Sequence, residues 1–88
     1  SDVASVNHTL DNASGSIEDK KLNEIASYGN WLEMVLLMQA DKMLDEDLLK
    51  RFNFSDKVID FRTKANAATQ QDARLAEYIR AWTNISGV

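Results

Sequence analysis

The sequence contains no cysteine and no proline, and only three of its 88 residues are glycine. Without cysteine, the chain has no disulfide bonds, no zinc–thiolate sites and no cysteine nucleophile. The absence of proline and the scarcity of glycine favour long uninterrupted helices, and they disfavour an all-β chain, which needs many tight turns. The composition therefore indicates an all-α protein.

The chain also has fewer basic than acidic residues, ten against fourteen, so its net charge is −4. An acidic surface repels phosphate groups, so no nucleic-acid partner is expected. No apolar run approaches the roughly 20 residues that cross a bilayer, so we expect no membrane insertion. The first twenty residues lack the pattern of a signal peptide. The absence of disulfide bonds in so small a domain favours a reducing compartment, so we expect a cytoplasmic location. Asn-x-Ser/Thr sequons leave a secreted or surface-exposed location open, and they begin at Asn7, Asn12, Asn53 and Asn84.

A chain of this length forms one domain at most. Residues 1–16 are rich in serine, asparagine and aspartate, which predicts a flexible N-terminal arm. The remaining residues, 17–88, are predicted to form a single α-helical domain. Its helices are expected over about 17–44, 45–52 and 56–85.

Two stretches of the chain carry apolar residues at alternating steps of three and four, the spacing of a helical seam. The first seam consists of Leu22, Ile25, Gly29, Leu32, Leu36, Gln39 and Met43. The second seam consists of Val58, Phe61, Ala65, Ala68, Asp72, Leu75, Ile79 and Trp82. Two seams joined by a short link predict an antiparallel helical hairpin with a short third helix in the link. We expect such a hairpin to complete a helical bundle by oligomerisation.

The first long helix carries a second apolar stripe that a single neighbouring helix cannot cover. Aromatic and methionine side chains are enriched in protein interfaces, so this stripe is the candidate interface. Its residues are Tyr28, Trp31, Met34, Val35 and Met38. In the alternative interpretation the chain is a closed three-helix monomer, in which the link segment folds back over the stripe. That segment would contribute Leu48, Leu49, Phe52 and Phe54.

Asp72 is the charged member of the second seam. A buried lone carboxylate is costly, so the side chain should either be paired or reach solvent. If paired, Asp72 is predicted to fix the register of the helices, as polar seam residues do elsewhere. Candidate donors are Trp31, Asn30 and Arg74. If unpaired, the middle of the last helix should face water.

Catalytic and metal-binding patterns are missing. His8 is the only histidine, and it lies in the predicted arm. The densest acidic cluster, at Asp41, Asp45, Glu46 and Asp47, lacks the glycine and glutamate positions of a calcium-binding loop. We therefore predict no catalytic residue, no metal, no cofactor and no enzymatic activity.

These features predict a non-enzymatic helical protein–protein interaction module, such as an adaptor, a chaperone or an assembly subunit. It would bind a second copy of itself or another helical protein through an apolar helix face. The alternative is a small regulatory protein that acts on transcription by binding a protein partner through its acidic surface. An electrostatic partner of that kind should dissociate as salt is raised, whereas an apolar contact should persist.

Overall fold

The structure is a computed structural model that describes residues 3–86, with side chains described for residues 3–82. Over this range the chain folds into five helices and has no strand, so the predicted all-α class is confirmed. The helices are α1 (Val3–Asp11), α2 (Asp19–Ala40), α3 (Glu46–Arg51), α4 (Phe54–Ala68) and α5 (Ala73–Ser86). The last two residues of the predicted domain, 87–88, lie outside the described part of the chain.

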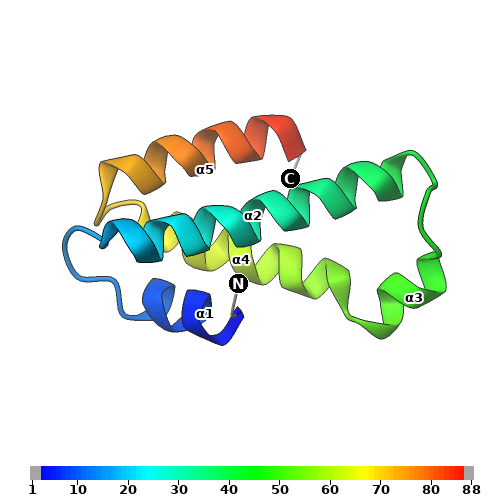
Figure 1. Ribbon diagram of the computed structural model, residues 1–88, viewed down its shortest axis with the longest axis horizontal. Coiled ribbons are helices and arrows are strands. Elements are labelled where there is room, and N and C mark those ends of the chain that lie inside the picture. The colour runs from blue at the N-terminus through cyan, green and yellow to red at the C-terminus, as the bar shows by residue number, and fades with distance from the viewer. Residues whose placement is uncertain (1–2, 87–88) are drawn as a thin grey trace.

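Helices α2 and α4 extend along the molecule in opposite directions (Figure 1). Helix α1 packs against both of them on one side, and α5 packs against both on the other (Figure 1). Helix α3 packs on α4 at the end where the chain passes from α2 to α4. The molecule is 40 Å long, and α1 and α5 lie over the same half of it, away from α3. The half of the α2–α4 pair toward α3 is therefore covered by neither α1 nor α5.

Helix α1 corrects the prediction of a flexible arm over residues 1–16. Val6 is 0% exposed and Leu10 is 5% exposed, because both pack into the core. Lys64 of α4 also forms an ion pair with Asp11 at 3.5 Å. A nine-residue helix is marginal alone in water, so its packing against α2 and α4 stabilises it.

Helix α2 ends earlier than the predicted boundary at residue 44. Lys42 adopts a left-handed conformation (φ 57°), which breaks the helix after Ala40. The Lys42 N–H donates to the Gln39 carbonyl, and the Met43 N–H donates to the Met38 carbonyl. These two bonds are those of a Schellman motif, with lysine at the position that glycine usually takes.

The chain also reverses direction within the long helix predicted over residues 56–85, so that prediction is wrong. Helix α4 ends at Ala68, α5 begins at Ala73, and α5 runs back in the same direction as α2 (Figure 1). The Thr69 hydroxyl donates to the Asn66 carbonyl at the end of α4. This side-chain bond competes with helix continuation, and Asp72 then starts the next helix.

Aromatic rings fill the space between α2, α4 and α5. Phe61 of α4 contacts Tyr28 edge to face, with centroids 5.5 Å apart, and it contacts Trp82 of α5 at 5.3 Å. The Trp82 indole Nε1–H donates to the backbone carbonyl of Gly29 at 2.8 Å, in a fully buried position. Such edge-to-face pairs are favourable beyond the area that they bury. This cluster connects the three longest helices.

At Gly29, side chains of α4 and α5 approach α2 closely. A Cβ at this position would lie 2.5 Å from the Tyr78 hydroxyl oxygen and 3.0 Å from a Phe61 ring carbon. The single proton of the Tyr78 hydroxyl is shared between two acceptors, Asn30 Oδ1 at 2.7 Å and the Ala26 carbonyl at 3.0 Å, and Phe61 is 1% exposed. Neither group can move aside freely, so glycine is required here in spite of its poor helix propensity.

We predict that Gly29→Ala destabilises the protein by about 1–3 kcal/mol, because overpacking outweighs the gain of about 1 kcal/mol in helix propensity. Tyr78→Phe removes the hydroxyl that the new methyl group would meet. The double variant should therefore lose less than the sum of the two single losses. Urea unfolding followed by circular dichroism measures all three variants. Additive losses, or a gain for Gly29→Ala alone, would contradict the proposed steric conflict.

Candidate interaction surface

The predicted interface stripe is divided between the core and the surface. Tyr28 is 5% exposed and Val35 is 9% exposed, so these two residues belong to the core. Trp31 and Met34 are 47% and 51% exposed, and Met38 is half-buried. Tyr28 and Val35 are buried because α2 packs against more than one helix, whereas the prediction assumed a single neighbour.

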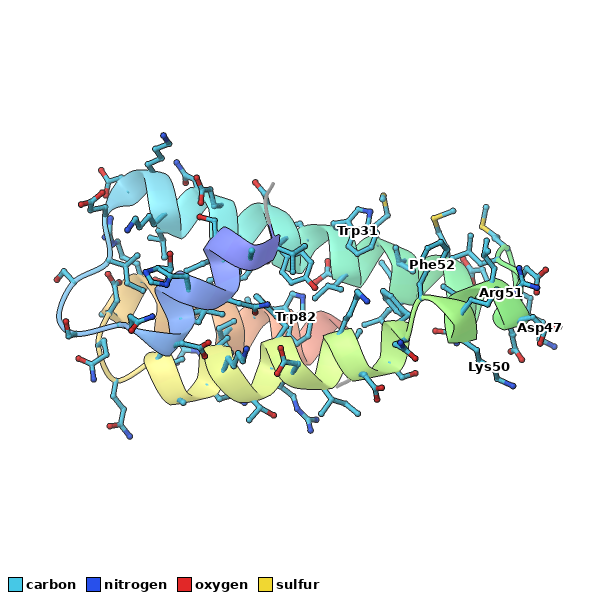
Figure 2. All side chains as sticks on the ribbon, turned by 90° about the horizontal axis from the view of Figure 1, so that it is seen from below. Trp31, Asp47, Lys50, Arg51, Phe52 and Trp82 are labelled. Carbon is cyan, nitrogen blue, oxygen red and sulfur yellow. The ribbon has the colours of Figure 1, made fainter. Side chains whose placement is uncertain are left out.

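Trp31 lies at the border between the covered and the uncovered half of the molecule. Its ring stacks on Tyr28 and meets Phe54 edge to face, each at 6.2 Å between centroids. Val3, Ser27, Tyr28 and Trp31 line a hollow of about 440 Å³ where the first residues of α1 meet α2. In Figure 2, Trp31 lies next to this end of α1, and Phe52 lies farther toward α3. The first residues of α1 therefore lie beside Trp31, and the exposed side chains of α2 continue from there toward α3.

The half of the molecule beyond α1 and α5 is called the open end here. It comprises the C-terminal half of α2, the residues through α3, and the first half of α4 (Figure 1). Its side chains include large apolar ones that are 47–65% exposed. They are Trp31, Met34, Leu37, Met43, Leu48, Phe52 and Ile59. These side chains form the candidate interaction surface, because large exposed apolar patches mark sites where proteins bind partners.

The link segment covers the core only in part. Phe54 is buried and Leu49 packs against the core, as the interpretation of a closed monomer requires. Leu48 and Phe52, however, are 47% and 61% exposed. The two residues are four positions apart, so they share a face of α3 that Leu49 does not share. The predicted link segment placed these residues together, although the helical spacing assigns Leu48 and Phe52 to a different face of α3 from Leu49.

Asp72 lies at the N-terminus of α5 and not within a continuous helix. Its Oδ1 accepts hydrogen bonds from the backbone N–H groups of Arg74 (2.8 Å) and Leu75 (3.3 Å), the geometry of an N-cap. Its Oδ2 accepts from the Ile17 N–H at 2.9 Å, in the segment before α2. The residue is 6% exposed, so it is buried and paired, and it does not face water.

Arg74 completes this arrangement, and it is the one predicted donor that reaches Asp72. Its guanidinium pairs with Asp72 and Asp19, and it donates to the Ile17 carbonyl at 2.6 Å. Hydrogen bonds from the Arg74 side chain and the Ile17 N–H hold the pKa of the Asp72 carboxyl far below its usual range. The hydrogen bonds to Asp19 and Asp72 raise the pKa of Arg74. All of these contacts lie within one copy of the chain. That Asp72 fixes an oligomeric register therefore stays a prediction.

Among the described residues, no group of three or more histidine, cysteine or acidic side chains is arranged to hold a metal ion. His8 is exposed, and its ring lies beside the Asn12 amide. A hollow of about 280 Å³ between α2, α3 and α4 has mixed polar and apolar walls. It is lined by Gln39, Glu46, Leu49, Lys50, Asn53, Phe54, Ser55 and Asp56. No helix in the described range is long and apolar enough to span a bilayer.

Comparison of the chain with known protein families, curated proteins and solved structures finds no match. The candidate surface is therefore defined by the exposure of its side chains and by the arrangement of the helices that carry them. Trp31 and Met34 are the members of the predicted interface that lie clearly on this surface. Met43, Leu48 and Phe52 extend it across the end of the molecule.

We predict that Met34→Asp changes the free energy of unfolding by no more than about 0.5 kcal/mol, because the side chain is half exposed. Val35→Asp, one residue along α2, should cost about 3 kcal/mol or more, because it places an unpaired carboxylate in the core. Urea unfolding at low micromolar protein concentration compares the two variants. Equal losses would contradict the division of the stripe into core and surface.

We also predict that Asp72→Asn lowers stability at neutral pH and that this deficit shrinks in acid. The folded pKa of Asp72 is depressed, so its stabilising effect is present above its unfolded pKa of about 3.9 and is lost as pH falls below that value. Unfolding midpoints in urea at pH 7, pH 4 and pH 2.5 provide the measurement. A difference between wild type and variant that stays constant over this range would show that the charge of Asp72 is unimportant.

Proposed function

We propose that this chain is a non-enzymatic helical interaction module that binds a protein partner through its open end. The observation that carries this proposal is the exposure of Trp31, Met34 and Phe52 on the open end. Helices α1 and α5 cover the core at one half of the molecule, whereas the other half presents large apolar side chains to solvent. A docked partner would remove this surface from water.

The residue types on the open end support the proposal. Tryptophan, phenylalanine and methionine are enriched in protein interfaces, and methionine adapts its shape to an irregular partner. Trp31 is also held in place on one side by Tyr28 and Phe54, so little side-chain entropy would be lost when its free side is covered. A rigid aromatic residue with adaptable neighbours is a typical hot-spot arrangement.

Photo-crosslinking in the cells that produce this chain tests the proposal. The photoreactive residue p-benzoylphenylalanine is placed at Met34 or at Phe52, on the open end, and at Arg80 of α5, on the covered half. We expect both open-end positions to yield a discrete crosslinked protein, either a second copy of the chain or another protein. Arg80 is exposed and serves as the control.

Mass spectrometry of the crosslinked product identifies the partner. Crosslinking that is equally strong at Arg80 and at the open end would mean that the contacts are non-specific. Absence of any product at Met34 and Phe52 would contradict the proposed function. Circular dichroism of each purified variant checks that the substitution leaves the fold intact.

A further inference from the structure

We propose that the partner at the open end is a second copy of this chain, and that the two copies meet across a two-fold axis at α3. This inference rests on the proposed function and names its partner. In a two-fold dimer the same patch is used by both subunits, so the patch must be complementary to itself. Helix α3 meets that requirement in both its charge and its apolar residues.

The charges of α3 are separated along its length. Glu46 and Asp47 occupy the first turn, and Lys50 and Arg51 occupy the last turn. All four are exposed, and none of them forms an ion pair with any other residue of the described chain. This arrangement suits the helix dipole, and it also leaves both charged ends available to a partner. If two copies of α3 pack antiparallel, each acidic end meets a basic end.

The face of α3 that would make this contact follows from the helical period. Asp47 and Arg51 are one turn apart, and so are Leu48 and Phe52, so the four side chains lie on adjoining rows of the helix. Figure 2 shows Asp47, Arg51 and Phe52 at the end of the molecule opposite to α1. With the axis at the level of Leu49, Asp47 of each copy lies opposite Arg51 of the other. The exposed side chain of Leu48 then lies next to the axis.

The size of the contact indicates which other residues take part. A stable interface buries roughly 800 Å² on each partner, and a six-residue helix is only about 9 Å long. Helix α3 alone is therefore too small, and the contact must extend over exposed apolar neighbours. Met43 is 65% exposed and lies three residues before the start of α3 in the chain. The net charge of −4 opposes association of two copies in general, so the paired ends of α3 would decide their orientation.

Sedimentation equilibrium of the purified chain, from about 1 to 200 μM, measures the dimer directly. We expect a reversible monomer–dimer equilibrium in this range. Asp47→Arg places two arginines opposite each other at both ends of the contact, and Arg51→Asp places two aspartates there. Each variant alone should raise the dimer dissociation constant about tenfold or more.

A mixture of the two variants provides the decisive comparison. In a mixed dimer, Asp47→Arg contributes two arginines and Arg51→Asp contributes two aspartates, so both ends become attractive again. We expect the mixture to associate at least as tightly as the wild-type chain. Glu77→Arg and Arg80→Asp make the same charge changes on exposed positions of α5, and they should leave the dissociation constant unchanged.

The possible failures are distinguishable. A monomer at every concentration overturns the second copy as the partner, and the crosslinking at Met34 and Phe52 then decides separately whether the open end binds another protein. A dimer that is indifferent to both charge changes, or variants that do not recover on mixing, overturns the axis at α3. Circular dichroism of each variant excludes loss of the fold as the cause of dissociation.

Discussion

The Asp72 carboxylate is the buried charge that joins the beginnings of α2 and α5. It accepts hydrogen bonds from the first turn of α5 and from the Ile17 N–H before α2, while Arg74 reaches from α5 to Asp19 at the start of α2. These bonds connect the beginnings of two helices that are distant in the sequence. They hold α5 beside α2 in the same direction, so the chain must reverse between α4 and α5. Because buried charge is tolerated only when it is paired, this cluster favours one arrangement over its alternatives.

The reversal determines which part of the molecule is covered. Since α5 turns back, it packs over the same half of α2 and α4 as α1 does, and the half toward α3 is left open (Figure 1). In the covered half, the Trp82 indole N–H donates to the Gly29 carbonyl. The Tyr78 hydroxyl also lies close to Gly29. Without a side chain at Gly29, α5 can come close enough to α2 for both contacts. Helix α5 therefore adds cover to the half of the molecule that α1 already covers, and neither helix covers the half toward α3.

The candidate surface could be predicted from the sequence only in part. The dense apolar run in α2 indicated that one neighbour would not cover the whole helix, and Trp31 and Met34 are indeed exposed. The same reasoning placed Tyr28 and Val35 on the surface, and they are buried, because α2 packs against more than one helix. Residue spacing identifies the faces of a helix, but it does not say how many neighbours pack against it. The number of neighbours also matters for α3, which packs on α4 with one face and leaves Leu48 and Phe52 exposed on another.

The sequence by itself determined the helical class and the residues of the second buried seam. Every member of that seam, from Val58 to Trp82, is buried in the structure, including Asp72. Only the tertiary structure decided that this seam belongs to two helices running in opposite directions. Apolar residues at helical spacing identify the side chains that are buried. The same spacing is found whether one long helix carries these residues or two helices joined by a turn do. Where the chain turns, Asp72 accepts hydrogen bonds from Ile17 and Arg74, and Ile17 is 55 residues away from Asp72 in the chain.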